Sequence, residues 1–191
     1  MPLPHSQKLF FIYVSLFLPS VALCGEVIQS HVSDKDGVYT AILVMQIKAP
    51  TDKVYALLTD YDELSRLSDN ITDSEIINQD PPKYTVVVKT QNCVLFFCKE
   101  LSQTQQALEL GKGFIVVEDI KGQSDFIFAE TYWHIFAHEK GTRVTFKSEM
   151  KPDFWLPPLL GPWIFQNAII DEATSMITRL EKLALKSDNN D

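Results

Sequence analysis

The pattern that most limits the fold is a series of strands followed by one long amphipathic helix. From residue 74 to residue 150, segments rich in β-branched and aromatic residues are separated by turn residues, which is typical of antiparallel strands. Residues 38–49 form an earlier strand that ends at Pro50, and a short helix is expected after it. From residue 163 to residue 185 the apolar period becomes helical. We therefore expect an α+β fold, with a curved antiparallel sheet of about seven strands wrapped on a long C-terminal helix.

The charge balance argues against nucleic acid as a partner. The 191 residues include 17 Lys and Arg against 25 Asp and Glu, a formal net charge of −8. Proteins that bind a phosphate backbone normally carry a basic patch or stripe, and the sequence has no such run. The hydrophobic share of 46% and the length fit one globular domain with a sizeable core.

The N-terminal segment has the pattern of a secretory signal peptide. Lys8 precedes ten uncharged residues, 9–18, and small residues follow at 20–22. The apolar run is shorter than the roughly 20 residues that a spanning helix needs. These features predict export rather than a membrane-spanning helix.

The expected mature protein follows from this segment. We expect residues 1–24 to be the signal peptide, residues 25–187 to form a single domain and residues 188–191 to fray. The protein would then be periplasmic or secreted. Two alternatives stay open, namely a membrane anchor made by residues 9–18 and acylation of Cys24.

Cys93 and Cys98 are the only cysteines after the N-terminal segment. In an oxidising compartment such a pair is more often a disulfide than two thiols. In one continuous strand the two residues would lie roughly 16 Å apart, whereas a disulfide needs Cα atoms within about 7 Å. A bond therefore requires the chain to reverse between them, and the alternative is two buried thiols. Two cysteines without a nearby histidine do not make a metal site, so no metal is expected.

The residues at this reversal are unusually apolar for a turn. They are Val94, Leu95, Phe96 and Phe97, where turns normally use Gly, Asn, Asp or Pro. Exposed apolar patches tend to mark contacts with membranes or partners. We expect this tip to touch a membrane surface transiently or to gate a pocket, unless it folds back under residues 154–156.

Two motifs resemble those of the START-like (SRPBCC) superfamily. Residues 47–61, Ile-Lys-Ala-Pro-Thr-Asp-Lys-Val-Tyr-Ala-Leu-Leu-Thr-Asp-Tyr, are similar to its strand-Ala-Pro-helix opening, and residues 141–146 are similar to its Gly-Thr-x-Val-x-Tyr/Phe strand. Trp133 resembles the Trp of the preceding strand. The chain is most similar to the polyketide cyclase/dehydrase and coenzyme Q-binding branch, over about residues 38–185. The resemblance implies the helix-grip fold, but this fold hosts carriers, cyclases, hydrolases and binding modules.

The resemblance also implies an apolar cavity between the sheet and the last helix. A ligand pocket is mostly apolar with a few polar groups. The expected function is to bind or carry a lipid, an isoprenoid quinone or a polyketide-like molecule, without catalysis and without a cofactor. The same side chains could also pack into a solid core without a cavity. In that case the expected function is that of a protein-interaction module. The residues expected to contact the ligand are Tyr84, Phe114, Trp133, Phe146 and Met176.

An enzyme is the alternative function. No nucleophile elbow, zinc-protease motif or phosphate loop is present in the sequence. Glu130 and His134 share one strand face, and if that face points inward they could act as the acid and base of a cyclase or dehydratase. If Trp133 points inward instead, both are surface residues, and the resemblance favours Trp133.

Overall fold

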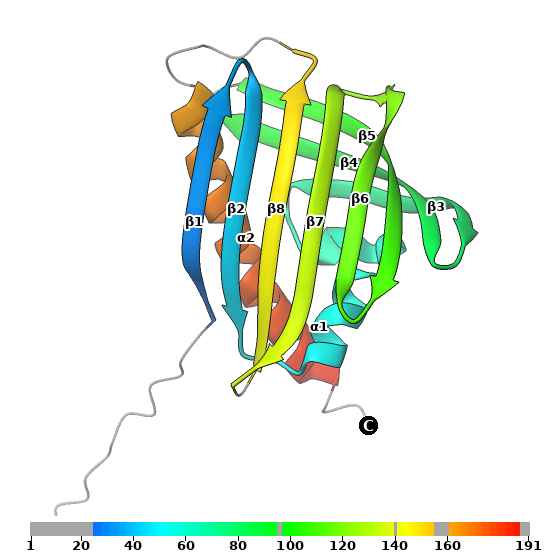
Figure 1. The fold of residues 1–191 in the computed structure, drawn as a ribbon, viewed down its shortest axis with the longest axis vertical. Coiled ribbons are helices and arrows are strands. Elements are labelled where there is room, and N and C mark those ends of the chain that lie inside the picture. Colours follow the sequence, from blue (N-terminus) through cyan, green and yellow to red (C-terminus); the bar gives the residue numbers. More distant parts are fainter. Residues whose placement is uncertain (1–24, 95–96, 140, 155–160, 188–191) are drawn as a thin grey trace, which may run out of the picture.

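The computed structural model describes residues 25–94, 97–139, 141–154 and 161–187, and it has the predicted α+β architecture (Figure 1). Two short helical segments follow the second strand, and one long helix ends the chain. In chain order the elements are β1 (Glu26–Lys35), β2 (Val38–Ile47), α1 (Thr51–Leu58), the 3-10 helix η1 (Tyr61–Arg66), β3 (Ile71–Asp80), β4 (Lys83–Val94), β5 (Phe97–Gly111), β6 (Phe114–Ser124), β7 (Phe126–His138), β8 (Gly141–Pro152) and α2 (Gly161–Ser187).

The strands form one antiparallel sheet in the order β1-β2-β8-β7-β6-β5-β4-β3. In Figure 1, β4 and β5 cross behind β2 and β8 at a steep angle, so the sheet is strongly curved. The helix α2 packs on β1, β2 and α1. This arrangement confirms the helix-grip fold.

The buried stripe of α2 explains why the helix lies against the sheet. Ala173, Ile177, Leu180 and Ala184 recur at intervals of three or four residues, and all four are buried. Burial of such a stripe against another element is what stabilises a helix that would be marginal alone in water. No helix among the described ranges has the length and apolarity to span a bilayer.

The sheet has eight strands rather than about seven, because β1 precedes the first predicted strand. It is an edge strand with mostly exposed side chains, so its sequence lacks the apolar alternation of a half-buried strand. His31 lies in this strand, directly opposite Ile42 of β2. Asp36 and Gly37, with φ of 55° and 74°, connect β1 to β2, and Asp-Gly is a strong hairpin signal.

Two apolar clusters make up the core. The larger lies between α2, α1 and the inner face of the sheet and includes Met45, Val144 and Ile177. The smaller lies under η1 and includes Tyr61 and Val86. The interior is therefore built in two parts, one held by α2 and the other by η1.

Candidate functional site

A cavity of about 210 Å³ lies where the two core clusters meet. Its walls come from α1, η1, the strands β3 to β8 and the helix α2. Most of the lining is apolar and includes Leu58, Leu64, Leu67, Ile115 and Val117. A space is therefore present between the sheet and the last helix, where the sequence predicted one.

Three of the five residues predicted to contact a ligand line this cavity. Trp133 of β7 and Phe146 of β8 pack edge to face, with ring centroids 4.7 Å apart. Met176 reaches the cavity from α2. The inner face of β7 thus carries Trp133, as the resemblance implied, and the aromatic pair forms one wall.

Tyr84 and Phe114 occupy other positions. Tyr84 is half-buried and packs on Tyr61 with 5.2 Å between the ring centroids, but it is not part of the lining. Phe114 is 44% exposed and stacks on His134 on the outer face. The prediction that Phe114 points inward is wrong, because Ile115 takes the inward position of β6. Residues 114–117 are all apolar, so the sequence offered no alternation to fix which face is buried.

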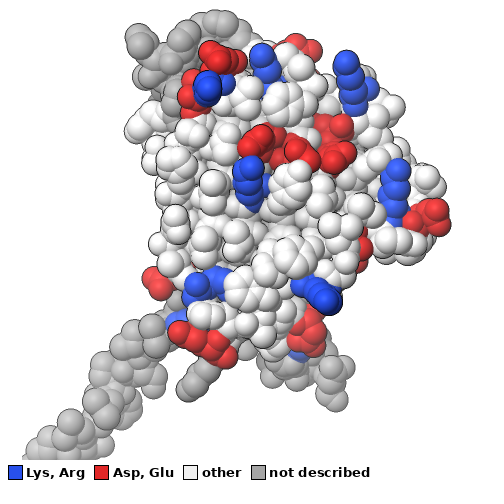
Figure 2. Space-filling view, viewed as in Figure 1, with Lys and Arg blue, Asp and Glu red and all other residues white. Residues whose placement is uncertain are grey.

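Glu130 and His134 also lie on the outer face, which Figure 2 views directly. His134 is stacked between Phe114 and Phe136, at 3.9 and 4.5 Å between ring centroids. Glu130 accepts a hydrogen bond from the hydroxyl of Tyr132. Neither residue lines the cavity. The hypothesis of an acid and base pair inside the cavity is therefore wrong. The pleat of β7 turns Trp133 inward, and residues at odd spacings from it, such as Glu130 and His134, point outward.

The same outer face carries a row of like charges. Glu118, Glu130 and Glu149 are directly opposite one another across β6, β7 and β8. Lys147 forms an ion pair with Glu149. Figure 2 shows acidic side chains grouped near the middle of this face, within a largely uncharged surface.

A buried hydroxyl in the lining was not predicted. Tyr61 is 6% exposed, and its hydroxyl makes no hydrogen bond within the described part of the chain. The nearby Glu109 carboxylate accepts the hydroxyl of Tyr55 at 2.6 Å. It also acts on the Tyr61 hydroxyl through its charge and through a side-chain contact that falls short of hydrogen-bond geometry. Burial, reinforced by Glu109, raises the pKa of Tyr61 above its ordinary value, so Tyr61 stays neutral. Spacing alone does not distinguish this tyrosine from a core residue.

The lining also contains polar groups that are held by neighbours outside it. Glu172 of α2 accepts a hydrogen bond from the side-chain amide of Asn70 at 2.6 Å. Gln105 of β5 donates its amide to Asp119 at 3.1 Å. Thr131 shares a hydrogen bond of 2.9 Å with Ser148. These groups were not predicted, because their roles depend on contacts between distant parts of the sequence.

Two bonds connect the segment after η1 to α2 beside the cavity. One is the bond between Asn70 and Glu172, and the other is the ion pair between Asp69 and Arg179. Ser68 and Glu172, on the two sides of this connection, both line the cavity. A separation of α2 from this segment would therefore open the cavity wall. We refer to the Asn70–Glu172 hydrogen bond and the Asp69–Arg179 ion pair together as the latch.

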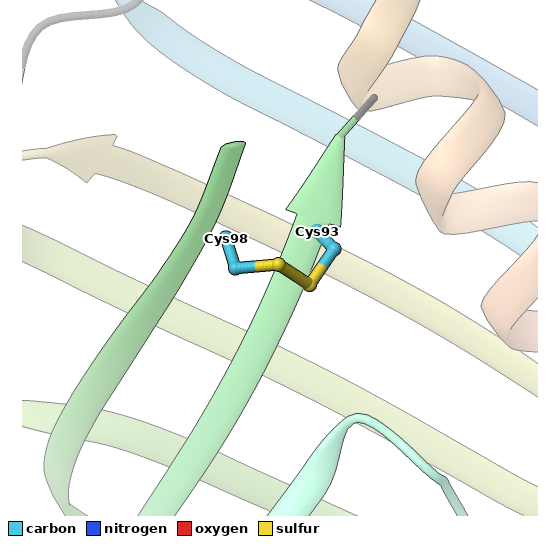
Figure 3. Close-up of a disulfide and its surroundings, with 2 residues drawn as sticks. All are labelled: Cys93 and Cys98. Atoms are coloured by element: carbon cyan, nitrogen blue, oxygen red, sulfur yellow. A yellow bond between two sulfur atoms is a disulfide. The ribbon is translucent and has the colours of Figure 1, made fainter. Parts of the chain in front are cut away.

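Cys93 and Cys98 are directly opposite each other on β4 and β5, with Cα atoms 4.0 Å apart (Figure 3). The chain reverses between them, as a bond requires, and their sulfur atoms are 2.06 Å apart. The apolar tip predicted to touch a membrane centres on Leu95 and Phe96, which lie outside the described residues. Within the described ranges, no group of three or more His, Cys, Asp or Glu is placed to hold a metal ion.

Solved structures share this fold at low sequence identity. An aromatase/cyclase, Zhui, from Streptomyces sp. R1128 matches with a TM-score of 0.64 and 11% identity, over 78% of this chain and 94% of that chain. A START superfamily protein from Mycobacterium smegmatis matches with a TM-score of 0.64 and 11% identity, over 75% and 98%. A STAR-related lipid transfer protein from Xanthomonas axonopodis matches with a TM-score of 0.56 and 14% identity, over 81% and 98%. The fold is therefore that of the START-like proteins.

The family follows from the sequence itself. The family model described as "Polyketide cyclase / dehydrase and lipid transport" matches residues 47–172. The chain belongs to this family, as the motifs around Pro50 and Trp133 indicated. No curated protein matches the sequence.

Proposed function

We propose that this domain binds a hydrophobic small molecule or lipid in its cavity and carries it without chemical change. The cavity between the sheet and α2, with walls such as Trp133, Phe146 and Met176, is the observation on which this function rests. Burial of apolar ligand surface contributes roughly 25 cal/mol per Å², which drives loading from water. The family description includes lipid transport, and a lipid transfer protein shares the fold.

Carriage is favoured over cyclisation because of where the acid and base candidates lie. Glu130 and His134 face away from the cavity and could not reach a molecule inside it. The lining residues with ionisable or hydroxyl groups are Tyr61, Ser68, Thr131 and Glu172. Three of them, Ser68, Thr131 and Glu172, are already bonded to protein groups.

The proposed setting is outside the cytoplasm. Residues 1–24 would direct export, with an anchor at 9–18 or a lipid on Cys24 as the alternatives. In such a compartment a bond between Cys93 and Cys98 would join the end of β4 to the start of β5. The apolar residues 94–97 between the two cysteines would touch a membrane surface transiently during exchange of the ligand.

Native mass spectrometry of the full chain, purified from its own host without detergent, tests carriage. We expect a bound apolar molecule, close to one per chain, that organic solvent extracts after denaturation. The matched control is Ala107→Leu, which puts a larger side chain into the cavity wall and should abolish the adduct. If the wild type and the control each show only the mass of their own polypeptide, with no extractable ligand in either, carriage is contradicted. The same spectra report whether residues 1–24 have been removed.

A further inference from the structure

The described lining of the cavity carries a single charged side chain. Glu172 is the only charged side chain in the lining, and no Lys, Arg or His belongs to it among the described residues. The other polar lining groups, Tyr61, Ser68, Gln105 and Thr131, are neutral. A ligand inside this cavity therefore meets a carboxylate and no cation.

A hydrogen bond from Asn70 holds the half-buried Glu172 side chain beside the cavity. Its Oε2 accepts the Asn70 amide at 2.6 Å, and its Oε1 makes no hydrogen bond within the described ranges. Arg179, two turns further along α2, forms an ion pair with Asp69. The Glu172 carboxylate is thus oriented by a neutral amide and has no cationic partner among the described residues.

A second carboxylate, that of Asp119, is bonded to a lining residue but does not itself line the cavity. Asp119 accepts hydrogen bonds from the amides of Gln103 and Gln105 and from the hydroxyl of Ser124. Gln105 lies between Asp119 and the cavity, because it is the member of this group that belongs to the lining. Two negative groups near a mostly apolar space repel an anionic ligand more strongly than they would in water. A neutral hydroxyl can instead donate to Glu172.

The size of the cavity limits the part of the ligand that it holds. At about 210 Å³ it exceeds an engineered cavity of about 150 Å³ that binds benzene, but it is below the range of about 300–1,000 Å³ for drug-sized ligands. One substituted ring, or a chain of comparable size, fits this volume. A polycyclic molecule or a second acyl chain would extend beyond it.

We propose that the cavity selects an uncharged alcohol or phenol with an apolar part of about this size, and that Glu172 rejects carboxylates and phosphates. This selection rests on the proposed binding of a hydrophobic ligand in the same cavity. Glu172 acts as a specificity-determining residue, because its carboxylate accepts the ligand hydroxyl and repels a ligand anion.

Calorimetric titration of the full chain with 1-octanol and octanoate, at neutral pH and low salt, tests this selection. Octanol partitions more readily out of water, so a preference of the wild type alone would not be diagnostic. The measured quantity is the ratio of the two dissociation constants. In Glu172→Gln, which keeps an acceptor for Asn70, we expect octanoate to bind about tenfold more tightly and octanol to change less than threefold.

The matched control is Asp171→Asn, which removes one charge at the neighbouring exposed position of α2. Its affinity ratio should equal that of the wild type, because residue 171 does not line the cavity. An unchanged ratio in Glu172→Gln, or an equal change in both variants, would overturn the selection by Glu172 and leave carriage intact. If neither probe binds to the wild type, the ligand class is wrong, and the native mass spectra decide separately whether carriage stands.

Discussion

At the scale of single residues, Tyr61 is the feature that packing alone does not explain. Its ring belongs to the smaller core cluster and lines the cavity, but its buried hydroxyl has no hydrogen bond within the described chain. A buried polar group without a partner costs about 1–3 kcal/mol. The neighbouring Tyr55 differs, because its hydroxyl donates to Glu109. The two tyrosines therefore have opposite consequences for stability.

We expect Tyr61→Phe to be as stable as the wild type or about 1 kcal/mol more stable near pH 8, since it removes an unpaired hydroxyl. The difference should grow above pH 10. The raised pKa means that folded Tyr61 keeps its proton while the unfolded chain loses it. The Tyr61 contribution to stability is therefore fully present below pH 10 and falls by about 1.4 kcal/mol per pH unit above it. Urea unfolding at pH 8, 10 and 11 measures both effects.

The control for this prediction is Tyr55→Phe. It removes a hydroxyl that donates to a carboxylate, so it should cost about 1–3 kcal/mol at pH 8. A comparable loss in Tyr61→Phe would show that the Tyr61 hydroxyl has a partner in solution. Parallel pH curves for Tyr61→Phe and the wild type would show that its proton is not retained on folding.

At the scale of elements, prediction succeeded where alternation or helical period was clear. The strands β2 and β8 and the helix α2 each have one buried face that the sequence marks. The prediction of the buried face of β6 was wrong, because residues 114–117 are uniformly apolar. The strand β1 was not predicted, because an edge strand needs no buried face and its sequence therefore lacks apolar alternation.

The polar residues of the site could not be predicted from the sequence for a different reason. Glu172 and Asn70 are 102 positions apart, and Tyr55 and Glu109 are 54 apart. Nothing in their local sequence marks these pairs, since only the curvature of the sheet brings them together. The apolar residues of the lining were easier to predict. The strand and helix periods mark Phe146 and Met176, and the family resemblance placed Trp133 on an inner face.

The latch gives a prediction about the elements that it joins. In Arg179→Gln the ion pair to Asp69 is lost, and we expect a bound ligand to dissociate several-fold faster because α2 separates more readily from the segment after η1. Stability should fall by less than about 1 kcal/mol, since the pair is largely exposed. Stopped-flow dissociation of a bound fluorescent fatty alcohol measures the rate.

The control for the latch is Lys89→Gln, which removes another exposed ion pair, to Asp73, at a site that does not line the cavity. Its dissociation rate should equal that of the wild type. An equal rate for Arg179→Gln would mean that the ligand leaves by another route.

At the scale of the whole molecule, the fold buries one long helix and one short one under the same sheet. Each holds its own apolar cluster, and the cavity is the space that neither cluster fills. A solid interior was the alternative for a protein-interaction module. A measurement in solution can distinguish an interior with a cavity from a solid one, because a larger side chain stabilises a protein only where it enters vacant space.

Ala107→Leu makes this test, since Ala107 is 2% exposed and lines the cavity. We expect a gain of about 1–2 kcal/mol, or roughly 2–8 °C in Tm, from the added apolar burial, together with loss of the ligand. The comparison is Ala41→Leu, which is fully buried but outside the lining and should cost about 1–3 kcal/mol by overpacking. Scanning calorimetry of the ligand-free proteins measures both. Equal losses in the two variants would mean that the interior around Ala107 is as tightly packed as that around Ala41, which would exclude the carrier.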